Sequence, residues 1–232
     1  MMDEHKWSHA FKLDPDKYIS DEDLERICES GSDGIIVGGS SGVTFDNTID
    51  LLGRIRRYAI PCVLEVSNRE AIVPGFDHYY IPFVLNAQNP EWIIEPHVQA
   101  VKELGTIIPW QDVSLVGYCV LNPKATVARM TDSRTSLDAE DVIAYGRFAQ
   151  HLLHCSYFYI EYSGTFGDMD LVRHAYQSFK KDGDMHILYG GGIKYPDQVQ
   201  QAVTVSDTVV VGNIIYEDIR AAIQTVKEVK TT

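Results

Sequence analysis

Short apolar runs alternate along the chain with longer stretches whose apolar residues recur every three or four positions. Several of the short runs are unbroken, VVV at 209–211 being the clearest. Unbroken apolar runs of this length are typical of strands buried on both faces, as in parallel sheets. The pattern predicts eight strands: Ala10–Leu13, Gly34–Val37, Cys62–Glu65, Tyr79–Val84, Ser114–Val120, Tyr157–Glu161, Ile187–Tyr189 and Thr208–Val211.

The longer stretches predict helices between the strands. The segment between the third and fourth strands, residues 67–77, is short and contains Pro74 and Gly75, so a full helix is not expected there. Regular alternation of strands and helices implies right-handed crossovers and a parallel sheet. Eight units favour a closed (β/α)₈ TIM-type barrel formed by residues 1–232 as one domain, with a doubly wound open sheet as the alternative. The predicted helices are Asp21–Ser30, Asn47–Tyr58, Pro90–Leu104, Asp138–Leu153, Asp168–Lys181, Pro196–Val203 and Glu217–Val229.

Charge and composition narrow the range of partners. The net charge is −13, which disfavours nucleic acid and anionic lipid as broad partners but leaves room for an anionic substrate in a local site. The four cysteines are far apart and form no metal-binding spacing, so reduced thiols in a cytoplasmic protein are expected. No apolar stretch is long enough to span a membrane, and the first residues do not resemble a secretory signal.

Both candidate folds bind ligands beyond the carboxyl ends of their strands, so polar residues at those positions are the candidates for function. Lys12 and Asp14 end the first strand and, being two residues apart, share a face. A lysine can bind phosphate and a carboxylate can hold Mg²⁺, although a solvated ion pair has the same spacing. The second strand is followed by GGSSG at 38–42, which either allows a close backbone approach or forms an ordinary turn.

The sixth strand ends in a second group of candidates. Glu161 follows an apolar stretch and is a candidate general base, because partial burial raises the pKa of a carboxyl group. Tyr159 and Ser163 lie on the same face as Glu161. The alternative is a structural tyrosine beside a surface glutamate.

Glycines after the last two strands give the strongest signal. GGG occupies 190–192 at the end of the seventh strand, and Gly212 with Asn213 follows the eighth. Barrel enzymes often bind phosphate in these two loops, where glycine backbone presents N–H donors to the anion. The spacing therefore predicts a phosphate site.

Several segments together resemble one known family. They are FKLDP, the GGS turn, CVLEVS, AIVPGFD, YIEYSG, YGGGIK and VVVGNIIYE, in that order between Trp7 and Val229. Their order and spacing resemble those of the geranylgeranylglyceryl and heptaprenylglyceryl phosphate synthases, and the bacterial heptaprenyl members most closely. The resemblance covers nearly the whole chain and rests on seven separate motifs.

The resemblance implies a modified barrel in which helix 3 is replaced by a strand or loop. It implies transfer of a long polyprenyl group, heptaprenyl in the bacterial members, from its diphosphate to the C3 hydroxyl of sn-glycerol 1-phosphate, with Mg²⁺. Lys12, Tyr159 and Glu161 would be catalytic, and Asp14 and Ser40 would bind Mg²⁺. The residues that would contact glycerol 1-phosphate are Lys12, Tyr159, Glu161, Tyr162, Ser163, Gly164, Gly192, Gly212 and Asn213.

A long prenyl chain needs an apolar groove, and the segments 72–84 and 93–104 could line it. Ala100 stands where the family's shorter-chain enzymes have a bulky aromatic residue, which favours a longer donor here. A homodimer in the cytoplasm is expected from the family, with peripheral membrane contact because donor and product are lipids. Three alternatives stay open: a geranylgeranyl donor, an isomerase or aldolase-type barrel with the same phosphate site, and a non-catalytic phospholigand-binding barrel. The groove residues expected are Ile72, Phe76, Tyr80, Phe83 and Val101.

Overall fold

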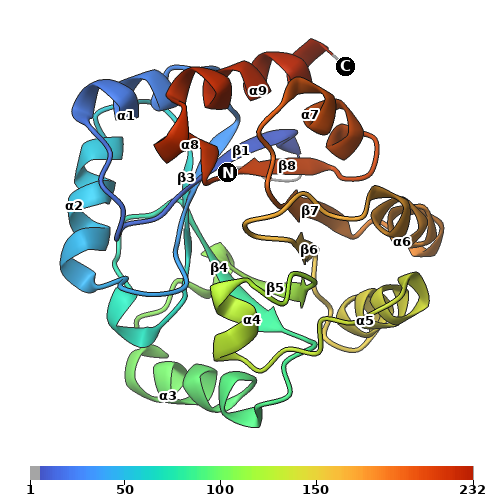
Figure 1. Cartoon of the computed structure of the whole chain (residues 1–232). Coiled ribbons are helices and arrows are strands. Elements are labelled where there is room, and N and C mark those ends of the chain that lie inside the picture. Colours follow the sequence, from blue (N-terminus) through green and yellow to red (C-terminus); the bar gives the residue numbers. More distant parts are fainter. Residues whose placement is uncertain (1–5, 232) are drawn as a thin grey trace.

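The computed structural model describes residues 6–231, which fold around a closed barrel of eight parallel strands. Each strand pairs with the next, and β8 closes the barrel by pairing with β1, as the view along the barrel axis shows (Figure 1). All eight strands predicted from the sequence are present within one residue at either end. They are β1 His9–Leu13, β2 Gly34–Val37, β3 Cys62–Glu65, β4 His78–Val84, β5 Val113–Val120, β6 Tyr157–Glu161, β7 His186–Gly190 and β8 Thr208–Val211.

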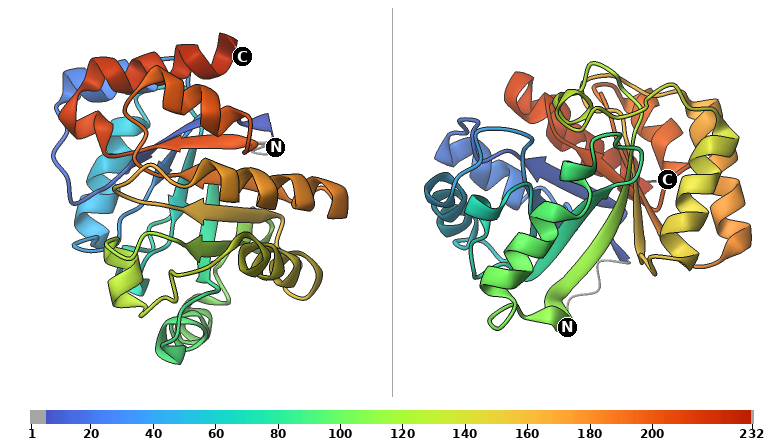
Figure 2. Two further views of the ribbon diagram at one scale, coloured as in Figure 1. Left: turned by 45° about the vertical axis from the view of Figure 1, so that its right-hand side comes forward. Right: turned by 90° about the horizontal axis from the view of Figure 1, so that it is seen from below.

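Helices surround the barrel on its outside, and α9 near the C-terminus lies beside α1 and α7 (Figures 1 and 2). Each of the seven predicted helices has a counterpart. The second begins two residues earlier than predicted because Thr44 and Asn47 form a capping box at its start. The helices are α1 Asp21–Cys28, α2 Phe45–Ile55, α3 Glu95–Leu104, α4 Thr126–Met130, α5 Ala139–His151, α6 Met169–Asp182, α7 Pro196–Val203, α8 Ile214–Glu217 and α9 Ile219–Thr231.

Two of these helices, α4 and α8, are absent from the prediction. They have five and four residues, too few for a helical period to be visible in the sequence. The predicted helix from Pro90 is also divided, with the 3₁₀ turn η3 Pro90–Trp92 preceding α3. Another such turn, η4 Trp110–Asp112, leads into β5.

Side chains alternate between the barrel interior and the surrounding helices. Along β4, Tyr80 and Val84 belong to the interior cluster, whereas Tyr79 belongs to the outer one. Along β6, Tyr157 and Tyr159 point inward and Phe158 packs against Phe179 of α6. This period of two decides which residues can reach a ligand at the barrel mouth.

The connection between β3 and β4 contains a single 3₁₀ turn, η2 Arg69–Ala71, in place of a helix. The prediction of no full helix in this segment is therefore confirmed. The helix after β4, α3, has no buried residue and lies at the edge of the molecule (Figure 1). Together these two features leave the outer face of β4 uncovered by a closely packed helix. No helix within residues 6–231 combines the length and apolar character that a membrane crossing requires.

Candidate active site at the carboxyl ends of the strands

Lys12 lies at the carboxyl end of β1 and points into the barrel mouth. Its Nζ is 2.8 Å from Oε1 and 2.9 Å from Oε2 of Glu65, the last residue of β3. The hydroxyl of Tyr118, from β5, donates to the same carboxylate. The Tyr118 ring stacks on that of Tyr159, with centroids 4.6 Å apart, and Lys12 Nζ lies 5.5 Å from the Tyr159 centroid. The mouth therefore holds one cation between a carboxylate and two aromatic rings.

Glu161 lies across the mouth at the end of β6 and is 3% exposed. Its Oε1 accepts a 2.7 Å hydrogen bond from the backbone N–H of Ser163, and the Tyr159 hydroxyl donates to the same carboxylate group. Asn122 holds the same loop through a 2.5 Å bond from its Nδ2 to the carbonyl of Ser163. The carboxylate is thus fixed in orientation and nearly removed from water.

The charges at the mouth shift one another's protonation. Burial raises the pKa of Glu161, and the nearby Lys12 and the Ser163 bonds offset only part of that shift. Burial acts to lower the pKa of Lys12, but the carboxylates of Glu65, Glu161 and Asp14 outweigh it, so its pKa lies above the usual value. Burial raises the pKa of Tyr159 well above its ordinary range, with Glu161 adding to the effect. Lys12 is therefore charged, and the Tyr159 hydroxyl keeps its proton and donates a hydrogen bond. Burial makes the Glu161 carboxylate more basic than one in water.

Asp14 and Ser40 lie at the same rim. Gly39 packs so closely on Asp14 that a Cβ atom there would overlap the carboxylate, which brings the turn containing Ser40 against it. One oxygen of Asp14 accepts from the backbone of Asp16 at 3.1 Å, and burial raises the pKa of Asp14. No group of three or more His, Cys, Asp or Glu side chains in residues 6–231 is placed to hold a metal ion. Carboxylate and hydroxyl oxygens suit Mg²⁺, which retains water and substrate ligands, so the pair fits such an ion.

The two glycine turns lie at the same rim of the barrel as Lys12. They follow β7 and β8, which are neighbours in the barrel, and β8 in turn pairs with β1. Gly192 has φ of 53° and lies against the backbone of Thr165 and Phe166, so no residue with a side chain would fit. Gly212 lies next to Lys12, and Asn213 accepts a 3.1 Å bond from Lys17. Both turns therefore follow strands at the same rim as Lys12, and the role predicted for them stays a prediction.

One predicted contact residue, Tyr162, differs in orientation from the others. Tyr162 is buried in the outer cluster, where it packs near Tyr189 and against Gly167, so its side chain faces away from the mouth. Only its backbone can meet a ligand there. Gly164 has φ of 86° in the exposed loop after Ser163, a conformation that favours glycine.

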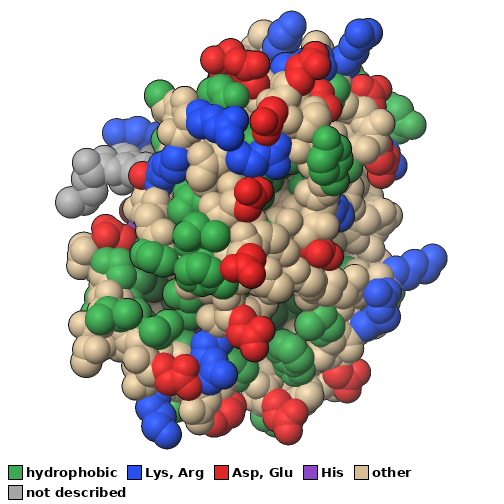
Figure 3. All heavy atoms as spheres, turned by 90° about the vertical axis from the view of Figure 1, so that its left-hand side faces the viewer, with side chains coloured by type: hydrophobic (Ala, Val, Ile, Leu, Met, Phe, Trp, Pro, Cys, Tyr) green, Lys and Arg blue, Asp and Glu red, His purple; other side chains and the backbone are tan. Residues whose placement is uncertain are grey.

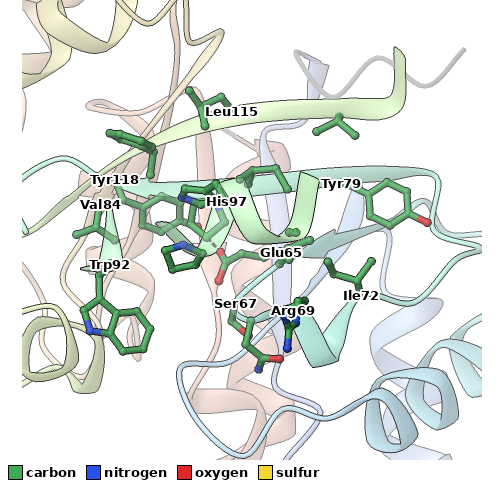
Figure 4. Close-up of a pocket in the computed structure, with 18 of the residues that line it drawn as sticks. Glu65, Ser67, Arg69, Ile72, Tyr79, Val84, Trp92, His97, Leu115 and Tyr118 are labelled. Carbon is green, nitrogen blue, oxygen red and sulfur yellow. Dashed lines mark hydrogen bonds between the residues drawn. The ribbon is translucent and has the colours of Figure 1, made fainter. Parts of the chain in front are cut away.

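A cavity of about 780 Å³ joins this polar mouth to a long apolar groove. Lys12, Ser40, Glu65, Glu161 and Ser163 line its polar end. The groove passes over the outer face of β4 and β5 and beneath α3, and Figure 4 shows Glu65 and Tyr118 among its lining residues. Figure 3 faces the left-hand side of the molecule as drawn in Figure 1, and it shows hydrophobic side chains gathered toward the lower half of that face. The apolar lining includes Ile72, Ile81, Phe83, Ala100, Val101, Leu104, Ile107 and Leu115.

Three of the five expected groove residues, Ile72, Phe83 and Val101, line the cavity. The other two were assigned wrongly. Tyr80 points into the barrel, because the outward residues of β4 are its odd-numbered neighbours. Phe76 is buried in the outer cluster, edge-on to Tyr79.

Sequence reasoning missed Glu65, Tyr118, Asn122 and Lys17. Glu65 had a signal, since it ends an apolar strand in the same way as Glu161. Tyr118 had none, because an aromatic residue within an apolar strand is ordinary core material.

The fold and site define a (β/α)₈ barrel whose mouth combines glycine turns and buried carboxylates with an extended apolar cavity. The PcrB family model matches residues 2–230, and the chain belongs to that family. It is 55% identical to the heptaprenylglyceryl phosphate synthases of Bacillus mycoides (strain KBAB4) and Bacillus cytotoxicus, over 230 residues that cover 99% of each chain.

Solved structures agree on the fold. The (S)-3-O-geranylgeranylglyceryl phosphate synthase of Thermoplasma acidophilum, in complex with sn-glycerol-1-phosphate, has a TM-score of 0.80 at 22% identity, covering 96% of this chain and 94% of its own. Wild-type GGGPS from Thermoplasma volcanium has a TM-score of 0.79 at 23% identity, with coverage of 97% and 94%. At these identities the likeness establishes the barrel architecture alone.

Proposed function

We propose that the protein transfers a long polyprenyl group, heptaprenyl, from its diphosphate to the C3 hydroxyl of sn-glycerol 1-phosphate. The observation that carries the proposal is the single cavity that runs from Glu161 and Lys12 into the apolar groove. One end suits a small phosphorylated alcohol and the other a long hydrocarbon chain. The names of the full-length relatives agree with this pairing of substrates.

The phosphate of the acceptor would lie on the backbone of Gly192 and Gly212, with Lys12 and Asn213 beside it. Backbone N–H donors and one ammonium group are enough to bind a dianion when it is partly removed from water. Binding at this end would hold the acceptor with its C3 hydroxyl toward Glu161, which converts a bimolecular encounter into an oriented one.

Glu161 would act as the general base. In the transfer, a bond forms between the C3 oxygen and C1 of the prenyl chain, the bond from C1 to the diphosphate oxygen breaks, and the hydroxyl proton passes to Glu161. The bonds from Ser163 N–H and the Tyr159 hydroxyl orient its carboxylate. The stacked rings of Tyr118 and Tyr159 would stabilise positive charge that develops on C1.

Asp14 and Ser40 would hold Mg²⁺, which supplies charge to neutralise the leaving diphosphate. The polar end carries three carboxylates, from Asp14, Glu65 and Glu161, against the ammonium of Lys12. A divalent cation would offset the repulsion that this arrangement offers to an anionic donor.

A donor ladder tests the proposal. The protein is incubated with radiolabelled sn-glycerol 1-phosphate, Mg²⁺ and prenyl diphosphates of 20 to 35 carbons, and the organic phase is counted. Label that becomes extractable with the release of diphosphate, most rapidly with the C35 donor, is the expected result. Preference for the C20 donor would correct the chain length. No extractable label with any donor would reject prenyl transfer, and borohydride trapping on a lysine would then indicate aldolase-type chemistry.

A homodimer and peripheral membrane contact are part of the same proposal. Ile94, Val98, Ile107 and Trp110 surround the open side of the groove and are at least half exposed, which supports a covered or lipid-facing surface there. Sedimentation at several protein concentrations tests the dimer. Co-sedimentation with zwitterionic vesicles tests the membrane contact.

A further inference from the structure

Glu65 is the one carboxylate at the mouth to which the proposed reaction gives no role. It is 6% exposed, and its two oxygens are occupied by Lys12 and Tyr118. Gly38 makes room for it, because a Cβ atom at Gly38 would lie 2.8 Å from Glu65 Cβ. A buried carboxylate is costly unless it is paired and hydrogen-bonded, and both of its partners here line the cavity.

The contacts of Glu65 fix the position of the Lys12 ammonium group. A lysine side chain has four rotatable bonds and a compact head, so it does not hold one position unaided. Glu65 binds it on one side, and the rings of Tyr159 and Tyr118 lie 5.5 and 6.0 Å away on another. The remaining charged groups that face Lys12 are Glu161 and Asp14. An ammonium has three donors, so the pairing leaves capacity for an anion in the cavity.

Glu65 also reaches the base, through the aromatic pair. Tyr118 is held by Glu65 and stacks on Tyr159, whose hydroxyl donates to Glu161. One side chain on β3 thereby links the lysine on β1 to the carboxylate on β6.

We propose that Glu65 is a positioning residue that holds Lys12, and through Tyr118 the Tyr159 ring, in place for the phosphorylated acceptor. The inference rests on the proposed function, since it assigns the acceptor phosphate to Lys12. It predicts that loss of Glu65 weakens binding of the acceptor much more than binding of the prenyl donor.

Glu65→Gln is the decisive variant. Glutamine has nearly the same shape, but only its carbonyl oxygen accepts hydrogen bonds, whereas two donors face this position. The substitution removes the charge that pairs with Lys12 and the second accepting oxygen, so that Lys12 and Tyr118 must share one neutral oxygen. Tyr118→Phe removes one of the two bonds and retains the stacked ring. Glu65→Asp retains the charge on a shorter side chain.

The dissociation constant of sn-glycerol 1-phosphate is measured by calorimetry with the whole protein, and kcat and KM are measured for both substrates. We expect Glu65→Gln to raise the dissociation constant and the KM of the acceptor about tenfold, with the KM of the donor within about twofold of wild type. Glu65→Asp should recover part of the loss, and Tyr118→Phe should lower kcat more than it changes the acceptor KM. Glu70→Gln, an exposed glutamate five residues later, is the matched control.

Unchanged or tighter acceptor binding in Glu65→Gln would overturn the inference, because Glu65 would then compete with the phosphate for Lys12. Equal losses for both substrates would reduce Glu65 to a structural residue. If Glu65→Gln does not fold, as judged by circular dichroism, Glu65→Asp becomes the deciding variant. Acceptor binding that is weaker than in wild type, with donor binding unchanged, would then support the inference, and unchanged acceptor binding would contradict it. Failure of the wild-type protein to bind sn-glycerol 1-phosphate would instead reject the proposed function.

Discussion

Strand β1 carries a basic residue, His9 or Lys12, toward each end of the barrel, and the two have different surroundings. At the amino end, His9 is fully buried, and its two ring nitrogens lie 2.9 Å from the hydroxyls of Ser32 and Thr225. At the carboxyl end, Lys12 is partly exposed and lines a cavity. The polar groups around His9 are satisfied by one another, whereas those around Lys12 retain capacity for a ligand.

The neighbours of these residues extend the contrast. Asp33 accepts bonds from Ser8, the backbone of His9 and Lys230, which ties the last helix to the first strand. Burial lowers the pKa of His9 to about 3, so it is neutral in the folded protein. Around Lys12, by contrast, buried carboxylates face one another across an open mouth. The amino end therefore serves to close the barrel, and the carboxyl end holds charge that becomes useful only with substrate.

The largest expected effect is a loss of activity on substitution of Glu161, at the carboxyl end of the barrel. Glu161→Gln should lower kcat about a thousandfold, because the amide cannot accept the proton of the acceptor hydroxyl. Its free energy of unfolding should be unchanged or higher, since a buried carboxylate with a raised pKa is removed. Turnover of the labelled acceptor and denaturant unfolding measure the two quantities, with Glu140→Gln on the surface of α5 as the control. Full activity in Glu161→Gln would remove this residue from the base role.

The converse variant lies at the amino end. His9→Ala should lower the free energy of unfolding by about 2–3 kcal/mol, because it leaves a cavity in place of a buried ring and removes the bonds that the ring makes with Ser32 and Thr225. Below the unfolding temperature its kcat should stay within about twofold of wild type. His174→Ala, at an exposed position on α6, should change stability by less than about 0.5 kcal/mol. A large loss of kcat in folded His9→Ala would show that the two ends are coupled.

The pH dependence of stability isolates His9. Its pKa is lowered in the folded protein, chiefly by burial, so below about pH 6.5 the unfolded chain takes up a proton that the folded protein does not. The stabilisation that His9 provides is complete above pH 6.5 and should fall by about 1.4 kcal/mol for each unit below it, until the folded pKa of about 3 is reached. The difference in unfolding free energy between wild type and His9→Ala, measured from pH 7 to 4.5, cancels other groups. A constant difference would contradict the burial of a neutral His9.

The smallest expected effect concerns the length of the groove. Ala100 lines the cavity from α3, so Ala100→Trp should fill part of it and lower the preference for a C35 over a C20 donor about tenfold. Lys102→Trp places the same ring on an exposed position of α3 that does not line the cavity. Steady-state kinetics with both donors provide the comparison. The same ratio in both variants would exclude Ala100 from control of chain length.

The sequence was sufficient for the strands and for most of the mouth. Short apolar runs, several of them unbroken, located all eight strands, because a parallel barrel buries both faces of each. Lys12, Asp14, Glu161 and the glycine turns were found since polar or glycine residues that follow such runs must lie at one rim. Glu65 had the same pattern, but a carboxylate paired within the site is indistinguishable in sequence from a surface glutamate.

The groove was harder to predict, because it depends on which face of β4 is left bare. A shift of one residue exchanges the inner and outer faces of a strand, which is why Tyr80 was misplaced. The short helices α4 and α8 contain about one turn each and have no period to detect. Tyr162 faces outward because it continues the alternation of β6, in which Phe158 and Ile160 also face the helices, and this period of two could have excluded its side chain from the mouth.

The missing helix between β3 and β4 has a consequence for how barrel enzymes acquire substrates. New specificities on this architecture usually come from longer loops above the strands. Here the groove for an elongated hydrophobic substrate exists because a helix is missing. Without a closely packed crossover, the outward residues Tyr79, Ile81 and Phe83 line a groove that is continuous with the barrel mouth. In every eight-stranded barrel, crossover helices cover the outer faces of the strands. Removal of one crossover helix beside the mouth would therefore expose an apolar groove long enough for a lipid chain in an unrelated barrel, provided that the uncovered strand is apolar on both faces.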